Sequence, residues 1–128
     1  TIFNKYLRII HRLEIFVIAK SQMLRATIRC NTIMSDGRLK PIGAESIRKL
    51  LFKTKTQLIS IVLAQNGIDN DGASVIGEWL QHNTTLKSMT IACNSIGDDG
   101  IKDIAQGLKF NQTLTDIDIG NNLFGERG

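Results

Sequence analysis

A 28-residue repeat is the feature that most constrains the fold of this 128-residue chain. Five positions recur twice at that interval with the same internal spacing. They are Leu58, Ile61, Leu63, Asn66 and Ile68 in one copy, Leu86, Met89, Ile91, Asn94 and Ile96 in the next, and Leu114, Ile117, Ile119, Asn122 and Phe124 in the third. A unit this small cannot bury its own apolar residues, so such units are stable only when neighbours stack. The pattern therefore predicts a stacked repeat array.

Each repeat predicts one short strand followed by one helix. Apolar residues alternate around Ile61 and Leu63, which is the pattern of a strand with one buried face. Helices are expected over residues 73–83 and 101–111, each preceded by an Asp-Gly pair whose carboxylate can accept hydrogen bonds from the first helical turn. The Asn that follows each strand can bond backbone groups of neighbouring turns. We expect these residues to form a structural ladder: Asn31, Asn66, Asn94 and Asn122.

The same spacing extends toward the N-terminus with less fidelity. Residues 23–33 keep the spacing, but the interval to Leu58 is 35 residues, so about seven are inserted near residues 38–43. A helix is expected over residues 44–53. The segment 1–22 is predicted to be an N-terminal helix, either a cap or the remnant of a preceding repeat. Its basic amphipathic pattern would also suit a membrane surface or a calmodulin-like groove.

This pattern resembles the leucine-rich repeat family, and in particular its ribonuclease-inhibitor-like subclass of 28-residue β–α units. The resemblance covers residues 23–128, as an irregular repeat at 23–57, two regular repeats at 58–85 and 86–113, and a partial one at 114–128. It implies an α/β solenoid, a horseshoe segment with a parallel β-sheet on its concave face and helices on its convex face. Residues 122–128 match residues 94–100, so a further helix is expected to follow and the chain to be a fragment of a longer array.

Composition separates the chain into two electrostatic halves. Residues 1–55 hold 12 Lys or Arg and 3 Asp or Glu, for a net charge of +9, whereas residues 56–128 hold 4 and 9, for a net charge of −5. A uniformly basic nucleic-acid-binding protein is therefore disfavoured. The longest apolar run, from Ile15 to Ala19, is far shorter than the roughly 20 residues of a membrane-spanning helix. No transmembrane segment is expected.

Residues with reactive or ligating side chains do not form a pattern typical of catalysis. Cys30 and Cys93 are predicted to be reduced, because two intervening strand spacings of about 4.8 Å exceed the reach of a disulfide. His11 and His82 are isolated, with no nucleophile or carboxylate partner at a recurring position, and the segment 37–43 lacks the ending of a phosphate-binding loop. Asn83 and Asn111 match a glycosylation pattern but suit helix ends. We expect no catalytic residue, cofactor or metal.

The predicted binding surface is the concave face, formed by the outward residues of the strands. These residues are Arg25, Thr27, Arg29, Ser60, Val62, Ala64, Ser88, Thr90, Ala92, Asp116 and Asp118. The face runs from basic through small and neutral to acidic, and such a gradient can orient a dipolar protein partner.

The leading functional hypothesis is a non-enzymatic scaffold for protein–protein interaction, expected in the cytoplasm of a eukaryotic cell, with a cytoskeletal or axonemal location as a further expectation. Two alternatives remain. The similarity to the repeats of Ran GTPase-activating proteins implies a regulatory, GTPase-activating role. The basic N-terminal half would suit docking to an acidic surface such as tubulin, RNA or anionic lipid, with binding that weakens in salt.

Overall fold

A computed structural model of the chain describes residues 13–20, 23–30, 43–53 and 58–128. Two strands come first, β1 (Leu13–Lys20) and β2 (Met23–Cys30), followed by helix α2 (Ala44–Lys53). Strands and helices then alternate as β3 (Leu58–Val62), α3 (Asn70–His82), β4 (Ser88–Thr90), α4 (Asp98–Phe110) and β5 (Asp116–Asp118). The described part is therefore a β–α repeat fold with a β-hairpin at its N-terminal side.

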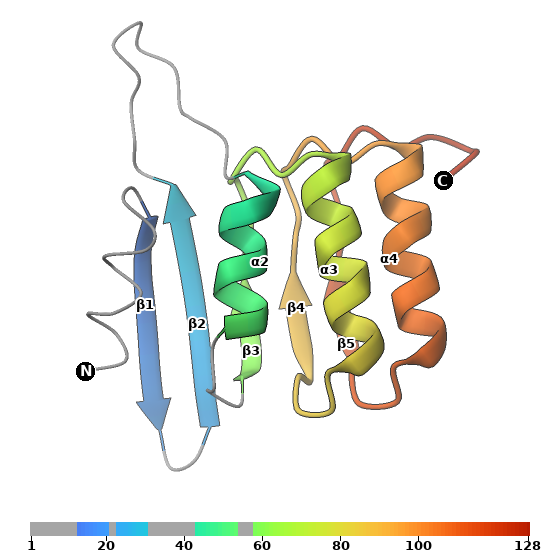
Figure 1. Cartoon of the computed structure of the whole chain (residues 1–128). Helices are drawn as coiled ribbons and strands as arrows, with labels where there is room; N and C mark the ends of the chain where they lie inside the picture. Colours follow the sequence, from blue (N-terminus) through green and yellow to red (C-terminus); the bar gives the residue numbers. More distant parts are fainter. Residues whose placement is uncertain (1–12, 21–22, 31–42, 54–57) are drawn as a thin grey trace, which may run out of the picture.

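The five strands form one sheet in chain order, from β1 to β5 (Figure 1). Strands β2 to β5 run parallel, as expected when each is reached from the previous one through a helix or crossover. Ile61, Met89 and Ile117 are partners in one register row. The 28-residue interval of the sequence is thus the interval between adjacent strands from β3 to β5.

Helices α2, α3 and α4 lie side by side on one face of the sheet (Figure 1). The core lies between the two layers, and the apolar repeat positions supply much of it. Leu63, Ile68, Ile91 and Ile96 are fully buried there, as is Leu80 from α3. The prediction of an α/β repeat with a parallel sheet covered by helices is confirmed at this level.

The predicted N-terminal helix is wrong for residues 13–20. This segment is strand β1, which pairs antiparallel with β2 from Leu13 opposite Cys30 to Lys20 opposite Met23. The rest of that prediction, residues 1–12 and 21–22, lies outside the described residues. Antiparallel pairing gives each of the eight β1 residues a partner on β2, and this pairing competes directly with helix formation in a short apolar segment.

Helix α2 has the predicted bounds, whereas α3 and α4 each begin three residues earlier than expected. The reason in α3 is the capping residue. The carboxylate of Asp69, and not that of Asp71, accepts a hydrogen bond from the Gly72 amide at 3.0 Å. Asp71 is instead an exposed residue of the first turn, where its charge still favours the helix N-terminus.

Helices α3 and α4 approach each other through glycines. A Cβ atom added to Gly107 would overlap the carbonyl oxygen of Gly77, and one added to Gly77 would overlap the carbonyl oxygen of Asp103. Neither obstacle is a flexible side chain. Glycine is therefore required at both positions for the observed helix spacing.

An exposed ion pair joins α2 to α3. Arg48 Nη2 donates to Glu78 Oε2 at 2.7 Å, and its guanidinium also lies 5.2 Å from the centre of the Phe52 ring. The hydrogen bond from Arg48 is the main reason that the pKa of Glu78 lies below its ordinary value of 4.5, and the same bond raises the pKa of Arg48. The pair is solvated, so its contribution to stability is small.

The Arg48–Glu78 pair predicts a pH-dependent difference between the protein and its Glu78→Gln variant. Because the pKa of Glu78 is lower in the folded state, its stabilising effect is complete above about pH 4.5 and disappears as pH falls through the depressed value. Thermal unfolding measured from neutral to acidic pH should therefore show a small deficit in Tm for Glu78→Gln that vanishes in acid. A deficit that persists undiminished in acid would contradict the assignment.

Candidate partner-binding face

The face of the sheet opposite the helices presents two register rows of side chains. Ser60, Ser88 and Asp116 form one row, and Val62, Thr90 and Asp118 form the other. We call this surface, defined by those six residues, the open sheet face. Its residues alternate along each strand with the core residues Ile61, Met89 and Ile117, as the two-residue period of a strand requires.

Exposure and charge both change across the open sheet face. Ser60, Val62, Ser88 and Thr90 are half-buried and uncharged, whereas Asp116 and Asp118 are exposed. Ala64 is half-buried and Ala92 is buried, with 8% of its surface exposed. The face thus carries small, neutral side chains over β3 and β4 and acidic ones at β5. Its electrostatic potential therefore becomes more negative toward β5.

For the basic end of the predicted face, on β2, the structure describes the backbone pairing but not the side chains. Arg25 pairs with Ser60 and Thr27 pairs with Val62 across β2 and β3, so both continue the two rows. Arg29 pairs with Glu14 of β1. The first pairs in β2 are shifted by an irregularity between Leu24 and Arg25, and Leu24, rather than Met23, lies opposite Leu58. The structure therefore brings the predicted rows together through their backbones.

The asparagine ladder holds successive repeats at the ends of the strands. Asn94 Oδ1 accepts from the backbone amides of Asn66 at 2.9 Å and Ile68 at 3.1 Å. In the same way, Asn122 Oδ1 accepts from the Ile96 amide at 3.1 Å. Asn31, the fourth predicted member, lies outside the described residues. Each described link joins neighbouring repeats, so the ladder fixes the positions of the strands that carry the open sheet face.

A second inter-repeat contact was not anticipated from the sequence. Asn70 Oδ1, on α3, accepts from the amides of Gly97 at 2.7 Å and Gly100 at 3.1 Å, and so caps α4 from the preceding repeat. Asp98, 28 residues after Asn70, makes the corresponding bond to the Gly125 amide at 2.7 Å. The sequence signal that could have revealed this contact is the recurrence of a short side chain with an acceptor oxygen at this repeat position, as Asn70 and then Asp98.

The two residues that match glycosylation patterns are engaged in helix-end contacts. Asn111 Nδ2 donates to the backbone oxygens of Leu80 at 2.8 Å and Asn83 at 3.1 Å. Asn83 Oδ1 accepts from the amides of Thr85 and Leu86. A glycan on Asn111 would replace one of the two N–H donors that join the repeats. The hydrogen bonds favour the structural interpretation of both residues.

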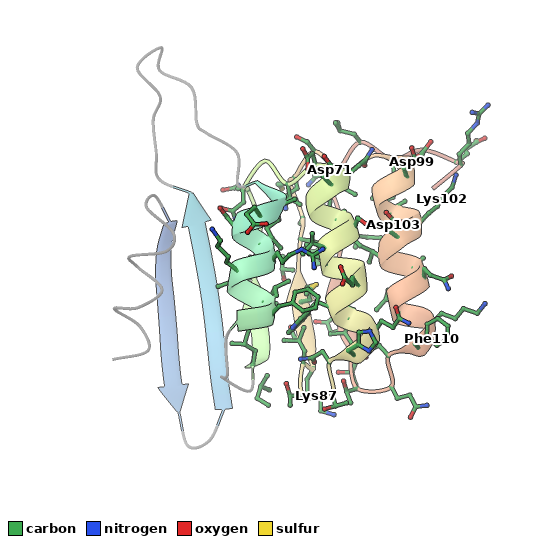
Figure 2. All side chains as sticks on the ribbon, viewed as in Figure 1. Asp71, Lys87, Asp99, Lys102, Asp103 and Phe110 are labelled. Atoms are coloured by element: carbon green, nitrogen blue, oxygen red, sulfur yellow. The ribbon has the colours of Figure 1, made fainter. Side chains whose placement is uncertain are left out.

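The reactive side chains within the described residues are dispersed. Cys93 is exposed and accepts a contact from Asn121 Nδ2 at 3.7 Å. His82 is exposed at the end of α3. Figure 2 shows Asp71 and Asp99 at the first turns of their helices, with Lys102 and Asp103 farther along α4. In the part of the chain that the structure describes, no group of three His, Cys, Asp or Glu residues is placed to hold a metal.

The helices of the described ranges are also too short or too polar to cross a membrane. The interpretations of His11, Cys30 and residues 37–42 stay predictions, because residues 1–12 and 31–42 are not described and nothing is described of the side chain of Cys30. Within the described residues, the open sheet face presents polar side chains in two register rows.

Comparison with known proteins supports the repeat assignment. The model of the Leucine Rich repeat family matches residues 82–105. A solved structure of the leiomodin-1 actin-binding site 2 (ABS2) is similar, with a TM-score of 0.58 and 26% sequence identity. The match covers 63% of this chain and 48% of the leiomodin chain, so this chain spans about half the length of that protein's structure. No curated protein matches the sequence. The match at residues 82–105 supports a leucine-rich repeat, and the fold of the chain is similar to that of the leiomodin-1 structure.

Proposed function

We propose that the chain is a non-enzymatic scaffold for protein–protein interaction and that its open sheet face contacts the partner. The observation that carries this proposal is the pair of register rows, which present the six residues of the open sheet face on the side of the sheet opposite the helices. Side chains held on strands are positioned more precisely than those on loops. The acidic end then orients a partner whose own charge is complementary.

Actin is the partner that we propose first. The similar leiomodin-1 structure is an actin-binding site, and the match covers 63% of this chain. A cytoskeletal location is part of the same proposal. We also propose that the chain belongs to the ribonuclease-inhibitor-like subclass, because the 28-residue interval is the length of that subclass's unit. In that subclass the solenoid is curved and the sheet lies on its concave face. The GTPase-activating and basic-docking alternatives stay predictions.

The test measures actin binding by co-sedimentation and by fluorescence anisotropy with labelled protein. The variant Asp116→Lys/Asp118→Lys reverses the acidic end of the open sheet face and should weaken binding at least tenfold. The variant Asp71→Lys/Asp103→Lys makes the same change in net charge on the helix side, and it should bind as the unaltered protein does. Thermal unfolding of both variants establishes that each is folded.

Two outcomes contradict the proposal in different ways. If the unaltered chain does not bind actin, then actin is the wrong partner. If both charge-reversed variants lose affinity equally, net charge rather than the open sheet face controls the interaction.

A further inference from the structure

A chemically labile dipeptide lies within the asparagine ladder. Asn66 is followed by Gly67, and this is the one position in the sequence where glycine follows asparagine. Asparagine in such a dipeptide can lose its side-chain amide, because glycine has no Cβ atom to hinder its backbone nitrogen from approaching the asparagine side chain. The ladder residues Asn94 and Asn122 are followed by larger residues. Asn66 is therefore the ladder member that is predisposed to deamidation.

The reaction replaces an amide by a carboxylate in two steps. In the first, the Gly67 nitrogen loses its proton to water and attacks Cγ of Asn66, a C–N bond forms, and the carboxamide nitrogen takes up a proton and leaves as ammonia. In the second, water opens the cyclic imide at either of its two carbonyl carbons. The products are aspartate and isoaspartate, in which the main chain runs through the former side chain. The net reaction consumes one water molecule and releases ammonia.

The folded repeat holds the Asn66 side chain in a geometry that opposes ring closure. Its Nδ2 donates to the carbonyl oxygens of Leu63 at 2.9 Å and Ala64 at 3.1 Å. The carboxamide is thus held toward the residues that precede it, whereas ring closure requires it to turn toward the residue that follows. Asn66 is also only 2% exposed, so little water reaches it to accept the proton or to open the imide.

The next repeat fixes the backbone on both sides of Gly67. Asn94 Oδ1 accepts from the amides of Asn66 at 2.9 Å and Ile68 at 3.1 Å, and we call these two contacts the Asn94 clamp. The carbonyl of Ile68 also accepts from the Ser95 amide at 2.8 Å. Ring closure requires rotation about the backbone bonds next to Gly67, and that rotation breaks the clamp. Protection of Asn66 is therefore a property of two stacked repeats.

We propose that Asn66 is a deamidation site that is protected while repeats 58–85 and 86–113 are stacked and reacts when they separate. The reaction makes the separation permanent. A carboxylate at this position has no N–H to donate to the carbonyls of Leu63 and Ala64, and it would be buried beside their oxygen atoms. This inference does not depend on which partner the open sheet face binds.

The test follows deamidation of the full chain at neutral pH by mass spectrometry of tryptic peptides, with fragmentation to locate the modified residue. A synthetic peptide of residues 61–71, which is too short to form stacked repeats, gives the unprotected rate. Asn66 should react at least tenfold more slowly in the chain than in the peptide. Urea below the unfolding transition should raise the chain's rate, relative to the peptide, in proportion to hydrogen exchange of the Ile68 amide, because the same opening releases both.

Two matched variants separate the clamp from the rest of the ladder. Asn94→Ala removes the clamp and should raise the rate at Asn66 at least tenfold, toward that of the peptide. Asn122→Ala makes the same change one repeat farther on and leaves the clamp in place, so it should leave the rate unchanged. Circular dichroism establishes whether Asn94→Ala is folded. If it is not, the comparison of urea dependence with exchange of the Ile68 amide decides the question.

The proposal is overturned if Asn66 reacts as fast in the folded chain as in the peptide, because the ladder would then give no protection. It is also overturned if the rate at Asn66 does not follow exchange of the Ile68 amide, or if Asn122→Ala accelerates the reaction as strongly as Asn94→Ala. A product that contains aspartate without isoaspartate would show direct hydrolysis and contradict the role of Gly67.

Discussion

Replacing Asn94 by Ala is expected to lower the free energy of unfolding by about 3–5 kcal/mol, a loss that would unfold many domains of this size. The Asn94 side chain is 8% exposed and takes part in five hydrogen bonds. Its Oδ1 accepts from Asn66 and Ile68, and its Nδ2 donates to the carbonyls of Leu63, Ile91 and Ala92. Ala would leave buried amides without an acceptor, at about 1–3 kcal/mol each.

Asn122→Ala is the matched control for this experiment. Asn122 occupies the same repeat position and makes similar bonds, including one from the Ile96 amide, but it is only half-buried. Water can replace its bonds, so we expect a loss of roughly 1 kcal/mol. Denaturant unfolding followed by far-ultraviolet circular dichroism measures both variants. Equal losses for the two would show that burial does not set the strength of the ladder.

Much of the fold could be predicted from the sequence because its apolar and Asn positions repeat every 28 residues. The interval that relates Leu58 to Leu86 also relates adjacent strands, so the pattern reports register as well as secondary structure. The alternation along β3 likewise predicts which residues face away from the helices. These features are local or repeat exactly, and a single sequence is enough to reveal them.

The N-terminal strand could not be predicted in the same way. Leu13, Phe16 and Val17 fall at helical spacing, but Leu13–Lys20 is also a run of eight mostly apolar residues that includes three β-branched ones. Such short segments suit either structure, and pairing with β2 decides between them. That pairing is a tertiary contact that the repeat pattern does not encode.

The two rows of the candidate site could be predicted from the sequence, but the contacts that support them could not. Asp116 and Asp118 follow from alternation alone. The cap that Asn70 provides to α4, in contrast, depends on the distance between two helix starts in space. This cap is a consequence of stacking, so it becomes visible only when neighbouring repeats are placed together.

Gly77→Ala is expected to destabilise the fold by about 2 kcal/mol, although Ala is the better helix former by about 1 kcal/mol. The added Cβ would overlap the carbonyl oxygen of Asp103 and lie 2.7 Å from its carbonyl carbon. These are backbone atoms within α4, so relief requires the two helices to separate. That movement opens the packing of Ile76 and Ile104 between the layers. Denaturant unfolding measures the loss.

Gly43→Ala and Gly107→Ala are the controls for this prediction. A Cβ at Gly43 meets nothing within 4 Å, so that variant should change stability little. Gly107→Ala should destabilise as Gly77→Ala does, because its Cβ would meet the backbone of Gly77. Since both substitutions force apart one contact, the double variant should lose less than the sum of the two single losses. Additive losses would mean that the glycines act independently, and a stabilised Gly77→Ala would mean that the helices are not held this closely.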